Sequence, residues 1–234
     1  MTQAATKLRI AEIFTSIQGE GIWAGVPSVF VRISGCNLRC SWCDTPYASW
    51  HPEGEILDVD EIVRQALAPA IRHVVITGGE PMLFEPVVDL AHRLKAGGTI
   101  ITIETAGTVF QSLPCDLMSV SPKLANSTPD DPHWGPIHEA SRTNIEVLTA
   151  LLLTYHCQLK FVVDPDRAED VAEVEALLRR LPTVDPDRIL LMPEGRDSAT
   201  LLQRSRSLVP ICSARGWRLS PRLHIDLFGD TRGT

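Results

Sequence analysis

Lysine is scarce in this chain of 234 residues. Four lysines stand among 22 basic residues, and with 29 acidic residues the formal net charge is −7. No stretch gathers positive charge into the basic stripe that nucleic-acid-binding proteins normally carry, so the composition argues against direct binding of nucleic acid. The arginine-rich stretch 204–222 is expected to lie on a solvated surface.

Long apolar runs are also missing. Nothing approaches the roughly 18 consecutive apolar residues of a membrane-spanning helix. The first residues, MTQAATKLRIAEIF, hold no apolar segment of the kind found in secretion signals. We therefore expect a cytoplasmic protein without a membrane partner. Disulfides are disfavoured in that compartment, so clustered cysteines indicate metal or redox ligands.

Low-complexity tracts, obvious repeats and linkers are absent, which predicts a single domain over residues 1–234. Hydrophobic periodicity predicts strands at 8–17, 27–33, 73–77, 99–105, 116–121, 158–163, 188–192 and 217–225. It predicts helices at 58–67, 84–95, 143–154, 167–181 and 198–215. Asp58 is expected to cap the first of these helices, with Glu61 completing the capping pair. Because strands and helices alternate, the chain is predicted to be an α/β protein built on a parallel sheet.

Polar and glycine-rich residues follow the ends of several predicted strands. These stretches are 35–45, 78–80, 104–107, 121–123 and 192–195. In barrel-like α/β folds the carboxyl ends of the strands carry the active site. We expect the functional residues to gather there.

Three of the six cysteines, Cys36, Cys40 and Cys43, follow the predicted strand 27–33 with the spacing C-x3-C-x2-C. No fourth cysteine or histidine is near, whereas a structural zinc normally takes four ligands. Three thiolates can hold three irons of a [4Fe–4S] cluster and leave the fourth iron open for chemistry, unlike the four-cysteine clusters of ferredoxins. The isolated cysteines are expected to be small buried apolar residues: Cys115, Cys157 and Cys212.

A second motif, Gly78-Gly79-Glu80-Pro81, stands one strand and one helix after the cysteines. The two motifs together resemble those of the radical S-adenosylmethionine (SAM) enzymes. The resemblance implies that the cysteines bind a [4Fe–4S] cluster whose open iron is chelated by SAM. It implies that Gly78, Gly79 and Glu80 bind the SAM amino group and that Trp42 lies by the adenine. Glu104, Thr105, Ser121 and Lys123 are then candidates for the SAM ribose and carboxylate.

Three further stretches, FTSIQGEG followed by VFVR, Cys43-Asp44-Thr45, and HIDLFG near the C-terminus, resemble the 7-carboxy-7-deazaguanine synthases of the queuosine pathway. This resemblance runs from about Ile10 to the end of the chain. It implies an incomplete (β/α)6 barrel with helices on the outside, and a homodimer. These enzymes are lyases that convert 6-carboxy-5,6,7,8-tetrahydropterin to 7-carboxy-7-deazaguanine and release ammonia.

The same resemblance assigns roles to individual residues. Gln18 and Glu20 would hold the edge of the pterin, and Thr77 and His224 would line its pocket. Arg32 would bind the substrate carboxylate through its guanidinium fork. A charge in the middle of an apolar strand needs a partner or a ligand, which supports a role for Arg32. Thr45 would ligate Mg²⁺.

A low-potential reductant such as flavodoxin would deliver the electron that starts the reaction. Two alternatives stay open at this point. A glycyl-radical-enzyme activase has the same cysteine spacing, but its substrate is a protein. A non-catalytic iron–sulfur or zinc module would bind metal without cleaving SAM.

Overall fold

Nine strands form one curved sheet in the computed structural model, which describes residues 6–234. The strands are β1 (Lys7–Ile17), β2 (Pro27–Ile33), β3 (Glu55–Asp58), β4 (His73–Gly78), β5 (Ile100–Thr105), β6 (Leu117–Val120), β7 (Cys157–Val163), β8 (Ile189–Pro193) and β9 (Arg218–Leu219). Their order in the sheet is β3-β1-β2-β4-β5-β6-β7-β8-β9. The two edge strands, β3 and β9, do not meet, so the barrel is incomplete, as expected.

The sheet is parallel from β2 to β9, but β1 runs antiparallel to both of its neighbours. The predicted parallel sheet therefore carries one antiparallel strand at this end. The connection 18–26 between β1 and β2 is too short for a crossover helix, so the two strands pair as an extended hairpin. Sequence periodicity missed β3, because its four residues form a short and partly exposed edge strand.

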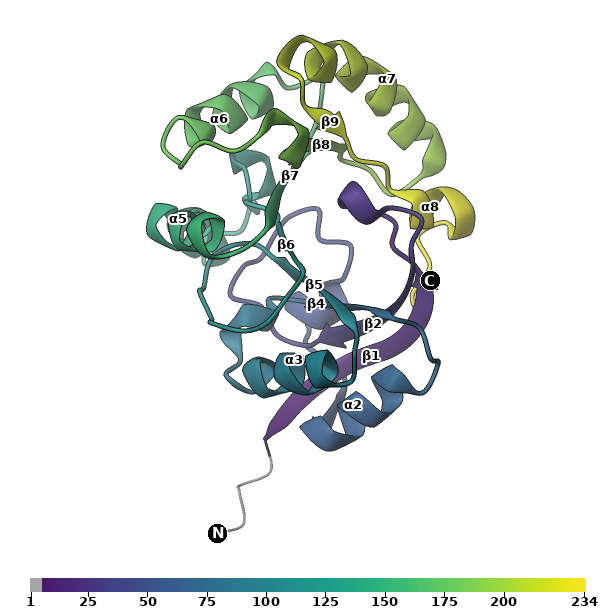
Figure 1. Cartoon of the computed structure of the whole chain (residues 1–234). Helices are drawn as coiled ribbons and strands as arrows, with labels where there is room; N and C mark the ends of the chain where they lie inside the picture. The colour runs from purple at the N-terminus through teal and green to yellow at the C-terminus, as the bar shows by residue number, and fades with distance from the viewer. Residues whose placement is uncertain (1–5) are drawn as a thin grey trace.

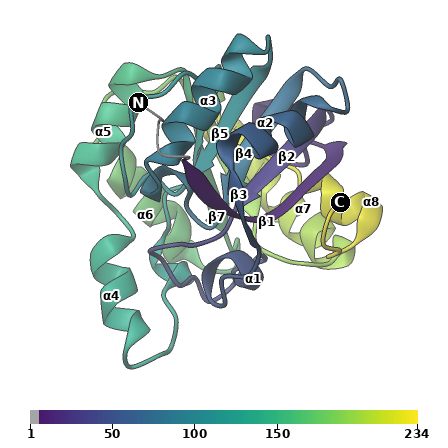
Figure 2. The same ribbon diagram turned by 90° about the horizontal axis from the view of Figure 1, so that it is seen from below.

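Helices pack around the outer side of the curved sheet, as Figure 1 shows for α2, α3, α5, α6 and α7. The α-helices among the described residues are α1 (Pro46–Ser49), α2 (Val59–Leu67), α3 (Pro86–Ala96), α4 (Trp134–Ser141), α5 (Ile145–Thr154), α6 (Ala168–Leu178), α7 (Ser198–Arg215) and α8 (Leu223–Phe228). Figure 2 shows that α4 projects away from this ring. None of the helices within residues 6–234 is both long and apolar enough to cross a bilayer.

The main core lies between the sheet and the outer helices. Strands β4 and β7 are buried along almost their whole length, as strands covered on both faces should be. Cys157 and Cys212 belong to this core and Cys115 packs against it, so the isolated cysteines are apolar packing residues. The inner face of the sheet also carries charged side chains, and these define the site described below.

Two local predictions need correction. The predicted strand 217–225 is a strand only over Arg218–Leu219, because Pro221 cannot donate to a ladder; the chain then turns into α8, which carries His224. Asp58 is the N-cap residue of α2, but its side chain makes no capping bond, and Glu61 pairs with Arg64 instead. The first five residues of the segment in which no secretion signal was expected lie outside the described residues.

Candidate active site

A cavity of about 350 Å³ lies inside the curve of the sheet and is large enough for a small-molecule ligand. Its walls include the carboxyl ends of β4, β5 and β8, which agrees with the expectation from sequence. Gln18 and Glu20 reach the same cavity from the end of antiparallel β1, which lies beside the start of β2. The cavity therefore extends from the carboxyl ends of the parallel strands into the interior of the partial barrel.

The three clustered cysteines lie in the loop 34–45 between β2 and α1. Cys40 is buried with Leu38 and Ala106 in a small apolar cluster, against which Cys36 and Cys43 pack. Burial raises the pKa of the Cys36 thiol to about 12 and that of Cys40 to about 11. Such neutral, sheltered thiols become strong ligands once a metal displaces the proton.

Within residues 6–234 no three His, Cys, Asp or Glu side chains converge on a point where one metal ion could sit. This arrangement does not suit a single zinc ion. A [4Fe–4S] cluster instead places each thiolate on a different iron, so its three cysteines need to be neighbours rather than to share one centre. The loop therefore fits the cluster that the spacing predicts.

The Gly78-Gly79 turn is tied to the start of the cysteine loop by backbone hydrogen bonds. The Gly79 amide donates to the Ile33 carbonyl over 3.0 Å, and the Glu80 amide donates to the Gly35 carbonyl over 2.9 Å. Gly78 has a φ of +139°, and a Cβ there would collide with the backbone of Ile33. The glycines are thus required for close contact between the turn and the cysteine loop, and both line the cavity.

Glu80 lies behind the glycine turn. Its carboxylate is fully buried and accepts hydrogen bonds from the amides of Met82 and Ala106 and from the Thr105 hydroxyl, at 2.7–3.1 Å. Burial raises the pKa of Glu80, although these donors act against the rise. In this structure Glu80 joins the turn to the end of β5, and its contact with the SAM amino group stays a prediction.

Trp42, Ser121 and Lys123, which are predicted to bind SAM, come together on one wall of the cavity. The Trp42 indole donates to the Asn126 side chain over 3.2 Å. The Lys123 ammonium lies 5.3 Å from the centre of the Trp42 ring and donates to the Ser121 hydroxyl over 3.0 Å. This wall presents an aromatic face and a cation beside the cysteine loop.

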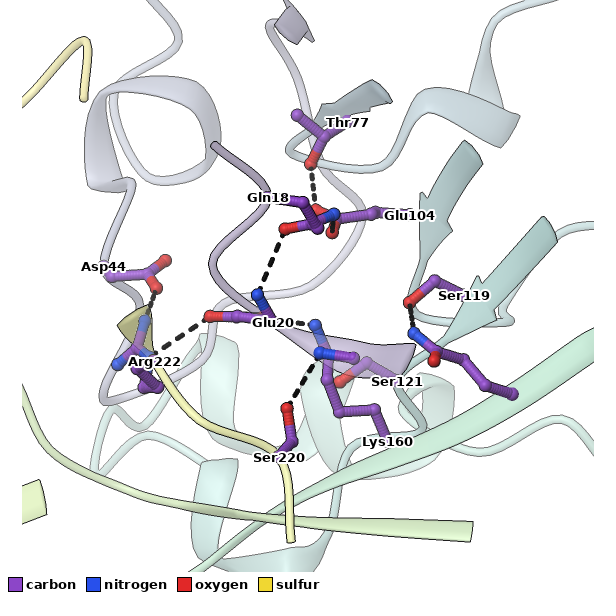
Figure 3. Close-up of polar contacts among 12 residues, drawn as sticks. Gln18, Glu20, Asp44, Thr77, Glu104, Ser119, Ser121, Lys160, Ser220 and Arg222 are labelled. Carbon is purple, nitrogen blue, oxygen red and sulfur yellow. Dashed lines mark hydrogen bonds and ion pairs between the residues drawn. The ribbon is translucent and has the colours of Figure 1, made fainter. Parts of the chain in front are cut away.

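Glu104 belongs with the residues predicted to bind substrate. Gln18 donates to one of its carboxylate oxygens over 3.1 Å, and Thr77 donates to the other over 2.8 Å (Figure 3). The Glu20 amide in turn donates to the Gln18 side-chain oxygen over 3.2 Å. Its contacts place Glu104 beside Gln18 and Thr77, and its role in binding the SAM ribose stays a prediction.

Glu20 is held by two buried cations that sequence analysis did not single out. Lys160 on β7 forms an ion pair with one carboxylate oxygen, and Arg222 donates to the other over 3.2 Å (Figure 3). Burial alone would raise the pKa of Glu20, but Lys160, Arg222 and His224 outweigh it and keep that pKa well below its usual range. Glu20 is therefore a carboxylate at any ordinary pH.

Arg222 also contradicts the expectation of a solvated surface over 204–222. It is 6% exposed, and besides Glu20 it binds Asp44 of the cysteine loop and the Gly195 carbonyl. Arg204 is likewise half-buried and paired with Glu194 and Asp164. Lys160 could have been found from sequence, because it interrupts an apolar strand just as Arg32 does.

Arg32 has the partner that its position in an apolar strand requires. Its Nε donates to Glu12 on β1 over 2.6 Å, and the Tyr47 hydroxyl donates to the same carboxylate over 2.8 Å. Arg232 near the C-terminus also lies 3.4 Å from Glu12. The hydrogen bond to Glu12 uses only the Nε of Arg32, and the residue lines the cavity, so the two terminal nitrogens are available to a ligand.

His224 and Thr45 also line the cavity. His224 lies against Gly19, where any Cβ would collide with its ring, and the Leu223 amide donates to the Gly19 carbonyl over 2.9 Å. Burial lowers the pKa of His224, so the ring is predominantly neutral near pH 7. Thr45 stands at the N-cap of α1 without capping it, and its hydroxyl lies 3.9 Å from the Cys43 sulfur. A hydroxyl oxygen is a ligand of the kind that hard cations take.

The incomplete barrel, the cysteine loop and the glycine turn define an enzyme of the radical SAM class, and the Radical SAM superfamily model matches residues 30–143. A 7-carboxy-7-deazaguanine synthase from Halobacterium salinarum is 44% identical, over 97% of this chain and 93% of the relative. One from Rhodopirellula baltica is 41% identical, over 98% and 90%. The chain belongs to the 7-carboxy-7-deazaguanine synthase family.

The crystal structure of QueE from Escherichia coli has the same fold, with a TM-score of 0.67 at 27% identity over 92% of this chain and 93% of that one. These similarities decide against the activase and against a non-catalytic metal module. Radical SAM enzymes use a [4Fe–4S] cluster and SAM, and this chain has the cysteines and the cavity for both.

Proposed function

We propose that this protein converts 6-carboxy-5,6,7,8-tetrahydropterin to 7-carboxy-7-deazaguanine in the cavity described above, and acts as a radical SAM carbon–nitrogen lyase. One observation carries the proposal. Five side chains expected to bind the pterin come from distant parts of the chain and line a single cavity, which the cysteine loop also borders: Gln18, Glu20, Arg32, Thr77 and His224.

Each of these side chains contributes to binding or orientation. Glu20 is ionised and can accept from the paired N–H groups of a guanine-like ring, while Gln18 and Thr77 are fixed by Glu104. The terminal nitrogens of Arg32 supply the charged fork for the substrate carboxylate. His224 closes the cavity from α8 as a neutral ring.

The cluster with SAM, when bound, supplies a hydrogen-abstracting radical after one-electron reduction. Cys36, Cys40 and Cys43 would hold the cluster. The Gly78-Gly79 backbone and the wall formed by Trp42, Ser121 and Lys123 would hold SAM. Because the cavity lies inside the curve of the sheet, the partial barrel limits the access of water to reactive species from that side.

We also propose Mg²⁺ at the Thr45 hydroxyl, where it would orient the substrate carboxylate. The low-potential electron donor, a protein such as flavodoxin, and a homodimeric assembly are proposed from the family resemblance. We propose a cytoplasmic location, because the sequence has no long apolar segment and clustered cysteines that bind metal suit a reducing compartment. A single domain is supported by the one continuous sheet of the described residues.

The test uses anaerobically reconstituted protein with SAM, dithionite, Mg²⁺ and the carboxytetrahydropterin. We expect 7-carboxy-7-deazaguanine by mass spectrometry, and a lower rate when Mg²⁺ is removed by chelation. Formation of 5′-deoxyadenosine without the deazaguanine would keep the radical SAM class and reject this substrate.

A further inference from the structure

Lys160 is a buried charge whose position no sequence motif explained. It lies in the middle of β7, a strand in which every residue is buried, and its side chain is 6% exposed. It lines the cavity between β6 and β8. Within residues 6–234 its ammonium forms one ion pair, with Glu20.

The two cations that hold Glu20 differ in what else they bind. Arg222 divides its guanidinium among Glu20, Asp44 and the Gly195 carbonyl. Lys160 is committed to Glu20, and Glu20 in turn raises the pKa of Lys160 against the effect of burial. An ammonium has three N–H donors, so two remain for atoms inside the cavity.

Glu20 and Lys160 together present a defined pattern to the cavity. A carboxylate has about four acceptor sites, and Glu20 uses one oxygen for Lys160 and the other for Arg222, which leaves acceptor capacity on both oxygens. The two remaining N–H donors of the Lys160 ammonium lie beside these acceptors. The pyrimidine ring of a pterin shows the complementary row along one edge, with an amino group, a ring N–H and a carbonyl oxygen.

We propose that Lys160 is a specificity-determining residue. It holds Glu20 as an oriented carboxylate and donates to the ring carbonyl that adjoins the N–H groups bound by Glu20. The pair would thereby select a two-donor, one-acceptor edge. This inference rests on the proposed binding of the pterin by Glu20, and it adds the residue that reads the carbonyl.

The decisive variant is Lys160→Met, which keeps the length of the side chain and removes its charge. We expect KM for the pterin to rise roughly 10- to 100-fold, the effect of losing a hydrogen bond from a charged donor, with a smaller change in kcat. The pH profile should change as well. With Lys160 absent, Glu20 loses one of the cations that lower its pKa while burial still raises it, so kcat/KM should begin to fall at a higher pH than in the wild-type enzyme.

The charged and titratable groups that face Glu20 are few: Lys160, Arg222, His224, Asp44 and Glu104. The double variant Glu20→Gln with Lys160→Met tests whether Glu20 is the group whose protonation causes the fall in kcat/KM of Lys160→Met at low pH. Gln does not titrate, so the double variant should lose the acid limb. It also removes both buried charges and should fold even if Lys160→Met does not. Lys95→Met, which breaks an exposed pair with Asp116, is the matched control and should behave as wild type.

Cluster absorbance and thermal melting confirm that each variant is folded and loaded. A Lys160→Met enzyme with unchanged KM and an unchanged pH profile, alongside a Glu20→Gln enzyme whose KM rises, would overturn the inference and leave the proposed function standing. A Glu20→Gln enzyme that binds the pterin normally would overturn the substrate role of Glu20, and the inference with it. Absence of the deazaguanine product from the wild-type enzyme would instead reject the proposed function itself.

Discussion

Replacing Arg222 by Met should be the most damaging single change outside the cysteine loop. The guanidinium is buried and joins three parts of the chain that are far apart in sequence: Glu20, Asp44 and the carbonyl of Gly195. Met fills most of the same space but leaves Asp44 and the Gly195 carbonyl without Arg222, and it leaves Glu20 with Lys160 as its remaining cation. The loss is therefore electrostatic rather than a loss of packing.

The expected size follows from the burial of the partners. Removing one member of a buried ion pair costs about 3–5 kcal/mol when the other member stays buried without compensation. Glu20 is buried, with 14% of its side chain exposed, but it keeps its ion pair with Lys160. The Asp44 side chain is 41% exposed, so its pair with Arg222 is partly screened by solvent. We therefore expect a loss below that range, about 2 kcal/mol. For a chain of this length that corresponds to a decrease of roughly 4–8 °C in the unfolding midpoint.

The assay is thermal unfolding, followed by circular dichroism, of wild-type and variant proteins carrying the same cluster content. Arg215→Met is the control, because Arg215 makes a more exposed pair with Glu175 that should contribute about 1 kcal/mol or less. Arg222→Lys should be intermediate, since an ammonium keeps the charge but cannot reach all three acceptors. A decrease for Arg222→Met no larger than that for Arg215→Met would refute this account of the buried network.

Two further outcomes are expected. Cys36→Ala should abolish both the cluster absorbance and product formation, whereas Cys115→Ala, which alters only a packing residue at the core, should retain both; equal loss in the two would contradict the assignment of the cluster loop. His138 accepts from the Arg39 amide over 3.0 Å and hydrogen-bonds the Ser127 hydroxyl over 2.9 Å, and burial lowers its pKa to about 4. The unfolded chain takes up that proton near pH 6.5, so the free energy of unfolding should decline as pH falls from about 6.5 to 4. Urea denaturation of His138→Gln, which cannot titrate, should show a shallower decline over that range, and an unchanged slope would exclude His138 as the source.

The neutral state of His138 also shows how the cysteine loop is held in place. The segment that follows β6 binds this loop at three residues within four positions. His138 accepts from the Arg39 amide, the Ser127 carbonyl accepts from the Ser41 amide, and Asn126 accepts from the Trp42 indole. Periodicity did not predict α4, which carries His138. Only the tertiary structure shows that α4 supports the cysteine loop, because the two segments are far apart in sequence.

The sequence predicted those parts of the site that depend on short-range features. The spacing of Cys36, Cys40 and Cys43, the two glycines at the end of β4 and the charge inside the strand 27–33 are short-range features, and each predicted its place at the cavity or beside it. Strand positions were predicted well where apolar runs were long and buried, as in β2 and β4. The prediction failed after Leu219, where a proline ended a strand that the apolar pattern would have continued.

The tertiary structure alone decided which charges meet. Glu20 and Lys160 are separated by 140 positions, and Glu20 and Arg222 by 202, so no periodicity relates them. Glu80 follows β4, and Glu104 lies within the neighbouring β5 near its end. The Glu80 carboxylate binds backbone amides behind the turn, whereas Glu104 lines the cavity. The sequence by itself determined the cysteine loop and the α/β alternation, because both depend on local spacing. The pairing of buried charges depends instead on how the curved sheet brings distant strands around one cavity, where each ion must find a partner once water is excluded.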